Sequence, residues 1–236
     1  MIELDNPVWH ALSGPQQSLG TSTGLAAKFQ SSICPFAGFP GDPGPSHWTD
    51  MATLLEPGGT TVLLNLPGES VPPEWTVLRV VGAIQMLGGG LGQDLREPEQ
   101  SIELLALGES DVADMLALVG EARPGPFLPR TIAFGGYLGI RVNGDLIAMA
   151  GQRLGPPGFT EISAVATRSD HRRQGHGERL VRAVAVAIMG RGQLPFLHVS
   201  NENVQAIRLY ESMGFTRRRS TTFTFVQAPP AGCSAS

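Results

Sequence analysis

The sequence has few of the residues that would indicate a disulfide framework, a metal centre or a membrane span. Only two of the 236 residues are cysteines, Cys34 and Cys233, and they lie about 200 positions apart. This spacing excludes a disulfide-rich scaffold and offers no metal-ligand pattern, so we expect no metal and a reducing, cytosolic location. No apolar run reaches the roughly 18 residues that a membrane helix needs, and the first residues do not have the pattern of a signal peptide.

Charged residues are also sparse, and the balance of charge argues against a nucleic-acid partner. They make up 16% of the chain, and the formal net charge is −4, so a general polyanion-binding surface is not expected. Basic side chains are concentrated in one short stretch, which contains Arg168, His171, Arg172, Arg173, His176, Arg179 and Arg182. This local concentration favours an anion site over a merely solvated face.

The basic stretch forms a loop between a predicted strand and a predicted helix. Residues 162–167 are mostly apolar, residues 178–188 have a helical pattern, and residues 171–177, His-Arg-Arg-Gln-Gly-His-Gly, lie between them. Backbone N–H groups in such a loop point at one spot, and the helix N-terminus adds about half a positive charge there. The loop therefore suits a pyrophosphate, although it has neither the Walker string nor the Gly-x-Gly-x-x-Gly fingerprint. Taken alone, it is equally compatible with an ordinary turn before a helix.

The segments that follow the loop resemble a known family. Arg172-x-x-Gly175-x-Gly177 is similar to the Arg/Gln-x-x-Gly-x-Gly/Ala loop of the GNAT superfamily of acetyl-CoA-dependent N-acetyltransferases. A short predicted strand over 195–200 comes next, and then Asn203-x-x-Ala206-x-x-Leu209-Tyr210-x-x-x-Gly214-Phe215 resembles that family's signature. The motifs cover about 155–225, the looser resemblance begins near 102, and the pattern looks closest to the FR47-like branch.

The resemblance and the residue pattern together predict an α/β (α+β) fold, with a mixed, mostly antiparallel twisted sheet flanked by helices. Strands are expected at 60–66, 76–87, 102–107, 137–142, 146–153, 159–167, 195–200 and 221–226, with a type I′ turn at Asn143-Gly144. A further helix is expected over 111–119. The predicted domains are a smaller N-terminal domain (1–95), a catalytic domain (100–228) and a disordered tail (229–236). The first is either a degenerate copy of the same fold or an unrelated cap, and Gly88–Gly92 is expected to be a flexible linker.

The resemblance implies a role for each residue that matches the family's motif. The main chain of Val165, Ala166 and Thr167 would pair with the pantetheine arm of acetyl-CoA. The loop formed by Arg172, Arg173, Gln174, Gly175, His176, Gly177 and Glu178 would hold the pyrophosphate; the family often has glycine where Arg173 stands. Asn203 would cap the next helix or contact CoA.

Two side chains are candidates for the chemistry. Tyr210 aligns with the tyrosine that many family members use as general acid toward the CoA sulfur, and the alternative is a packing role. Glu161 is the candidate general base, and the alternative is an exposed carboxylate at a strand end. His198, within an apolar strand, is expected to be a satisfied core histidine.

The implied function is acetyl transfer from acetyl-CoA, by direct attack, to a primary amine of a small molecule, an amino acid or a peptide. One alternative is a non-catalytic acyl-CoA-binding sensor or interaction module, and another is O-acyl transfer or the transfer of longer acyl groups. The connector after the first helix of the catalytic domain, residues 123–129, and the strand hairpins are expected to choose the acceptor. The chain is expected to be a monomer or homodimer with no nucleic-acid or membrane partner.

Overall fold

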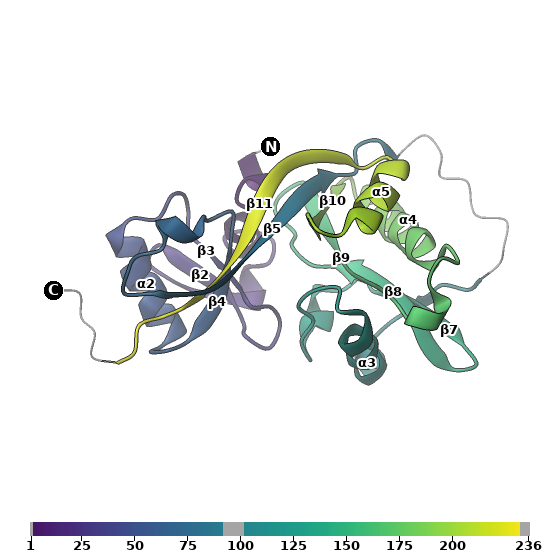
Figure 1. Cartoon of the computed structure of the whole chain (residues 1–236), viewed down its shortest axis with the longest axis horizontal. Coiled ribbons are helices and arrows are strands. Elements are labelled where there is room, and N and C mark those ends of the chain that lie inside the picture. Colours follow the sequence, from purple (N-terminus) through teal and green to yellow (C-terminus); the bar gives the residue numbers. More distant parts are fainter. Residues whose placement is uncertain (1, 92–101, 232–236) are drawn as a thin grey trace.

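The computed structural model describes residues 2–91 and 102–231, which form two halves around one twisted sheet (Figure 1). Within these residues the sheet has eleven strands in the order β1-β2-β3-β4-β11-β5-β10-β9-β8-β7-β6. The pairs β3–β4 and β9–β10 are parallel, and the other neighbouring strands are antiparallel. The predicted fold class, a mixed and mostly antiparallel sheet flanked by helices, is confirmed.

The N-terminal half contains the first five strands and two helices. Its elements are α1 (Pro7–Leu12), β1 (Gly20–Thr23), β2 (Ala26–Phe29), β3 (Phe36–Gly38), α2 (Pro45–Leu55), β4 (Thr60–Leu64) and β5 (Thr76–Leu87). Helix α2 joins the parallel strands β3 and β4. Its buried residues Trp48, Met51 and Leu55 are spaced three and four apart, so they form one apolar stripe that packs on the sheet.

The C-terminal half contains the basic loop and the signature. Its elements are β6 (Leu105–Ala106), α3 (Val112–Ala122), β7 (Leu138–Val142), β8 (Asp145–Gln152), β9 (Phe159–Thr167), α4 (His176–Met189), β10 (Leu194–Ser200), α5 (Val204–Ser212) and β11 (Thr216–Gln227). Buried residues of α4 and α5 share one core cluster, whereas those of α3 belong to another. The helices therefore cover opposite faces of the sheet. None of the described helices is long and apolar enough to cross a bilayer.

Strands β5 and β11 hold the two halves together. They pair with each other along their lengths, from Thr76 opposite Gln227 to Leu87 opposite Thr216. On its other edge β5 pairs with β10 of the C-terminal half, and β11 pairs with β4 of the N-terminal half. Each half is therefore completed by a strand from the other half, and Figure 1 shows both strands running between them.

The strand order repeats when the sheet is read inward from either end. From one end the strands are β2 and β3, then β4, which is parallel to β3 and reached through α2, and then the antiparallel β11. From the other end they are β8 and β9, then β10, which is parallel to β9 and reached through α4, and then the antiparallel β5. The interpretation of residues 1–95 as a degenerate copy of the catalytic fold stays a prediction, which this repeat supports. The predicted boundary between 95 and 100 lies outside the described residues.

The local predictions for turns, glycine-rich segments and the C-terminal segment have mixed outcomes. The turn at Asn143-Gly144 is confirmed by φ values of 51° and 91°. The linker prediction is wrong for residues 88–91, because Leu91 is buried in the core and the Gly88 N–H donates to the carbonyl of Pro195. Gly92 and most of the predicted tail lie outside the described residues, while the Pro229 carbonyl accepts a hydrogen bond from Gly58.

Candidate active site

The basic loop leads from β9 into α4 and has an unusual backbone. Arg172 is extended, Arg173 has a φ of 62°, Gly175 has a φ of 79°, and α4 begins at His176. Left-handed residues within such a turn direct neighbouring N–H groups toward one point, which creates an anion-binding concavity. Arg173 therefore holds the backbone conformation that glycine adopts without steric cost, although its own side chain disfavours it.

Acidic side chains near the loop are paired with other groups. Glu178 accepts a hydrogen bond from Arg182 at 2.8 Å, one turn further along α4. Asp170 is bound by Arg168 at 2.8 Å. These pairs reduce the repulsion that free carboxylates would exert on a bound diphosphate.

One buried donor of α4 lacks an acceptor. Nη1 of Arg179 is buried and has no hydrogen-bond partner among the described residues. Burial, His171 and Arg179 together lower the pKa of His176, the first residue of α4, so the Arg179 charge lies near the loop. A buried guanidinium nitrogen without a partner is destabilising. A phosphate oxygen would satisfy it, so these residues fit the phosphate groups of CoA.

Strands β9 and β10 are paired only over their first residues. Their register ends where Phe196 lies opposite Glu161, and beyond Glu161 that edge of β9 has no strand neighbour in the described part of the chain. Ala164, with a φ of 53°, forms a bulge at which the register between β8 and β9 shifts. The main chain at 165–167 is thus free on one edge to pair with an extended ligand.

The loop and the open strand edge lie side by side. A Cβ placed on Gly177 would be 3.8 Å from Oγ1 of Thr167 and 3.9 Å from Cγ1 of Val165. Nε of Arg172 donates to the Thr167 carbonyl at 3.3 Å. The structure therefore brings the predicted cofactor-binding residues of β9, the loop and the start of α4 to one corner of the sheet. Their contacts with CoA stay predictions.

Helix α5 carries the two remaining signature residues. Oδ1 of Asn203 accepts the Ala206 N–H at 3.1 Å, so the predicted helix cap is confirmed. Tyr210 packs edge-on against Phe215, and burial raises the pKa of its phenol to about 12. Its hydroxyl makes no hydrogen bond to the described residues. At neutral pH the phenol is therefore protonated and has no competing protein acceptor.

Glu161 lies in a buried network rather than at a surface. Its oxygens accept hydrogen bonds from Nε and Nη2 of Arg153 at 2.8 and 2.7 Å, and Nδ1 of His198 lies 2.7 Å from Oε1. Burial alone would raise the pKa of the carboxyl group. Arg153 and His198 outweigh this effect and lower the pKa from 4.5 to about 2. The exposed-carboxylate alternative is wrong, because the side chain is completely buried. The role of Glu161 as base stays a prediction.

His198 connects this network to the N-terminal half. Its Nε2 lies 3.2 Å from Nε2 of Gln85 on β5. Gln85 also donates to the Leu4 carbonyl and accepts from Arg218, at 2.8 Å in each case. Both ring nitrogens of His198 have partners, so the expectation of a satisfied histidine is confirmed.

A small cavity of about 170 Å³, which no sequence motif predicts, lies between the halves. Among its lining residues are Phe36, Arg79, Arg153, His198, Phe223 and Phe225. These come from five different strands or strand ends, and no local pattern links them. The connector after α3 also contributes Pro124, Gly125 and Pro126, and its role in choosing the acceptor stays a prediction.

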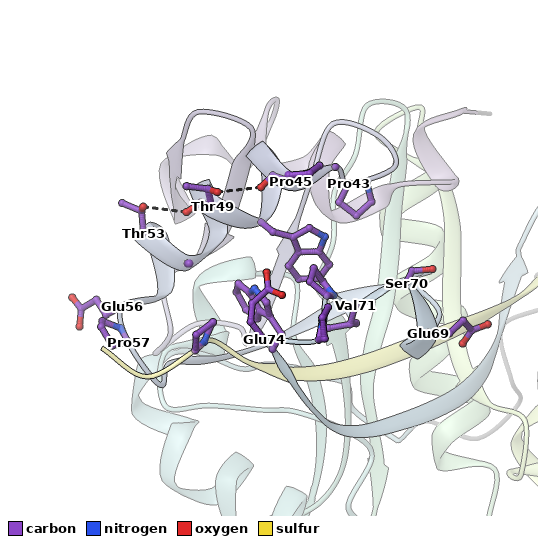
Figure 2. A pocket seen from close by; sticks show the side chains of 17 residues that line it. Pro43, Pro45, Thr49, Thr53, Glu56, Pro57, Glu69, Ser70, Val71 and Glu74 are labelled. Atoms are coloured by element: carbon purple, nitrogen blue, oxygen red, sulfur yellow. Dashed lines mark hydrogen bonds between the residues drawn. The ribbon is translucent and has the colours of Figure 1, made fainter. Parts of the chain in front are cut away.

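A cavity of about 1050 Å³ in the N-terminal half has a different character (Figure 2). Glu56, Glu69 and Glu74 line it together with several prolines, and no lysine or arginine is among the described residues of its lining. A negatively charged wall of this kind repels a diphosphate. This cavity is therefore unsuited to acetyl-CoA.

Comparisons with known proteins identify the family. The FR47-like protein family matches residues 137–224. A GNAT-family protein from Novosphingobium aromaticivorans is 36% identical, with coverage of 94% of this chain and 97% of that chain and a TM-score of 0.84. The chain belongs to the GNAT superfamily of N-acetyltransferases.

Two other relatives match less fully. N-alpha-acetyltransferase RimI of Mycobacterium tuberculosis is 36% identical over 84 residues, which are 34% of this chain and 52% of that protein. The match therefore spans about half the length of this curated relative. A GCN5-related N-acetyltransferase from Kribbella flavida shares the fold, with a TM-score of 0.54 at 20% identity over 91% of this chain and 90% of that chain.

Proposed function

We propose that the chain transfers an acetyl group from acetyl-CoA to a primary amine by direct attack. The observation that carries this proposal is the corner where the loop of residues 172–178 meets the unpaired edge of β9. One element offers N–H groups and arginines to a diphosphate, and the other offers a free strand edge to the pantetheine arm. The charge of Arg179 lies near His176, the first residue of α4, and adds to the positive potential of the loop.

Acetyl-CoA supplies a thioester whose acyl carbon is open to a neutral amine and whose thiolate is the leaving group. The new C–N bond forms as the C–S bond breaks, so the amine must lose a proton and the thiolate must gain one. Tyr210 is the proposed proton donor, because its phenol is protonated and free of other acceptors.

The resemblance assigns the opposite proton transfer to Glu161, and we propose that this residue acts through His198. Glu161 has no exposed surface and its carboxylate binds protons weakly. His198 lines the cavity between the halves and donates Nδ1–H to Glu161 in the tautomer that leaves a lone pair on Nε2. In this structure that lone pair faces the Gln85 amide at 3.2 Å, so Nε2 would take the amine proton by exchanging this contact for the substrate, while Glu161 fixes the tautomer and stabilises the charged ring.

The Gly175→Glu variant tests the proposed function. The new side chain would place a negative charge within the anion-binding turn, and a Cβ at this position meets no atom within 4 Å. We expect a folded protein without measurable CoA binding by calorimetry, and without amine-dependent release of free CoA thiol.

Gly192→Glu is the matched control. Gly192 also has a positive φ, 72° against 79°, and open space around a Cβ, but it lies just past the far end of α4. Both substitutions carry the same backbone strain, so only Gly175→Glu should lose CoA. Equal CoA affinity in both variants would overturn the proposal. CoA binding without thiol release for any amine would leave the binding-module alternative.

A further inference from the structure

The cavity between the halves borders the separated part of β9 and β10. Leu197 and Val199 of β10 pack into the core beneath α4 and α5. Side chains alternate along a strand, so His198 and Ser200, which line the cavity, project from the opposite face. Both lie beyond Phe196, the last residue of β10 that pairs with β9. The cavity therefore adjoins the strand gap from the side opposite Tyr210.

Arg153 provides a buried donor at this cavity. Its side chain is 8% exposed, and Nε and Nη2 are occupied by the carboxylate of Glu161. The third nitrogen, Nη1, has no hydrogen bond to the described residues, and the guanidinium lies 4.7 Å from the ring centre of Phe36. The cavity wall thus contains a fixed, charged donor that is free to bind a ligand oxygen.

Arg79 adds a net positive charge at the rim. It is exposed, its guanidinium lies 4.1 Å from the ring centre of Phe225, and it forms no ion pair with the described residues. The charge of Arg153 is balanced by Glu161, whereas the charge of Arg79 has no such partner. Neither an aspartate nor a glutamate is among the described residues that line the cavity.

The remaining walls are mostly apolar and the space is small. Phe36 and Phe223 lie with ring centres 5.8 Å apart, and Phe223 also meets the edge of His198 at 5.5 Å. A volume of about 170 Å³ is below the ~300–1,000 Å³ of pockets that bind drug-sized ligands. Polyamines and other polycations are disfavoured here, because the charge of the lining is positive.

We propose that this cavity is the acceptor site, and that it selects a small primary amine bearing a carboxylate and an apolar side chain, in other words a free apolar amino acid. Arg79 and Nη1 of Arg153 hold the carboxylate, and the phenylalanine rings pack on the side chain. The amine is then directed toward the strand gap. This inference rests on the proposed function and names the substrate class of the same site.

The proposal also gives the N-terminal half a part in specificity. Phe36 comes from β3 and Arg79 from β5, so the acceptor site is incomplete without that half. In the transfer, the amine nitrogen bonds to the acetyl carbon and releases one proton to the base, and the CoA thiolate takes one proton from the acid. No redox partner is required.

The test compares matched acceptors on matched variants. The wild-type chain is assayed for CoA release with leucine and phenylalanine, with their primary amides, and with spermidine. We expect kcat/KM to be roughly 10- to 100-fold higher for the acids than for the amides, the range for a hydrogen bond between charged groups. Arg79→Met should remove most of this advantage, mainly through KM, and should leave the amides within about threefold.

Two controls separate charge from folding. Arg79→Lys keeps the positive charge and should restore part of the preference for the acids. Arg217→Met removes an exposed arginine of β11 that lies outside the cavity and pairs with Glu211 of α5, and it should change the use of neither acceptor class. Calorimetry with CoA should give the wild-type affinity for all three variants, because none of these residues lies in the cofactor loop.

The outcomes separate this inference from the proposed function. Equal use of acids and amides, a preference for spermidine, or an equal loss on both classes in Arg79→Met overturns the acceptor assignment while acetyl transfer stands. If no amine is acetylated, the binding of leucine and phenylalanine to the CoA-loaded protein decides. Binding that requires the carboxylate and Arg79 supports the cavity assignment, and its absence overturns it.

Discussion

Nδ1 of His198 lies 2.7 Å from Oε1 of Glu161, and this contact joins β9 to β10 just where their main-chain pairing ends. Arg153 holds both oxygens of the same carboxylate from the end of β8. Three neighbouring strands are therefore tied together by side chains at the point where β9 and β10 separate. Such a buried network is stable only while every member has its partner.

Removing the carboxylate should weaken the fold and change its dependence on pH. Glu161→Gln leaves Arg153 as a buried charge without a counter-ion, a change that costs about 3–5 kcal/mol in similar pairs. The pKa of Glu161 is lowered by folding, from 4.5 to about 2, so its stabilisation is present above pH 4.5 and is lost as the pH falls toward 2. Urea unfolding of the wild type at different pH values should show this loss of unfolding free energy in acid. The unfolding free energy of the variant should depend less on pH over the same range.

Glu211→Gln is the control for that measurement. It removes the carboxylate of an exposed ion pair with Arg217, and exposed pairs contribute at most about 1 kcal/mol. The unfolding midpoint of this variant should stay near that of the wild type. A similar loss in both variants would show that burial of the Glu161–Arg153 pair has no special energetic role.

Tyr210→Phe should separate chemistry from binding. The substitution keeps the ring that packs on Phe215 and removes the proton that the thiolate would take. We expect kcat to fall roughly 10²-fold or more, the range for general acid catalysis, while calorimetry shows little change in CoA affinity. Unaltered turnover would mean that water or another group protonates the thiolate.

The parts of the site that the sequence predicted are those with local patterns. The bounds of β9 at Phe159 and Thr167, the loop, and α4 follow from an apolar run, two glycines and a helical stripe that are adjacent in the chain. The bulge at Ala164 has no such signal, because alanine rarely adopts a positive φ and its neighbours look like an ordinary strand.

Contacts between residues far apart in the sequence are the parts of the structure that local patterns do not predict. Strands β5 and β11 were both predicted, yet their pairing joins residues that are more than 100 positions apart, and no local property records it. The same limit applies to the surroundings of Glu161, for which the motif indicates only a position near the start of a strand. Its burial depends on Arg153 and on His198 from β10, and only the folded sheet brings these three side chains together.

Arg173 tests whether the loop acts through its backbone or its charge. At a φ of 62° the arginine pays roughly 1–2 kcal/mol relative to an unstrained residue, whereas glycine avoids this cost. Arg173→Gly should therefore keep the loop shape, unfold at or above the wild-type midpoint, and bind CoA within about tenfold of the wild type. Arg173→Val, whose branched side chain disfavours this φ, should lose both stability and CoA affinity. Equal CoA affinity in the two variants would show that the backbone conformation at this position is unimportant.

One acetyl-CoA should bind to each chain, through the C-terminal half alone. The equivalent turn of the N-terminal half, residues 39–44 between β3 and α2, contains two prolines that lack N–H groups and carries Asp42 in place of the arginines. The cavity of about 340 Å³ beside it is lined by Asp5 and Asp42, and its lining contains no lysine or arginine within the described part of the chain. A titration should therefore give one CoA per chain.

Removal of residues 1–95 also removes β5 and leaves β10 and β11 with unpaired edges, so the truncated chain should aggregate rather than remain an active monomer. Two CoA molecules per chain, or a soluble and fully active truncated monomer, would contradict this division of roles.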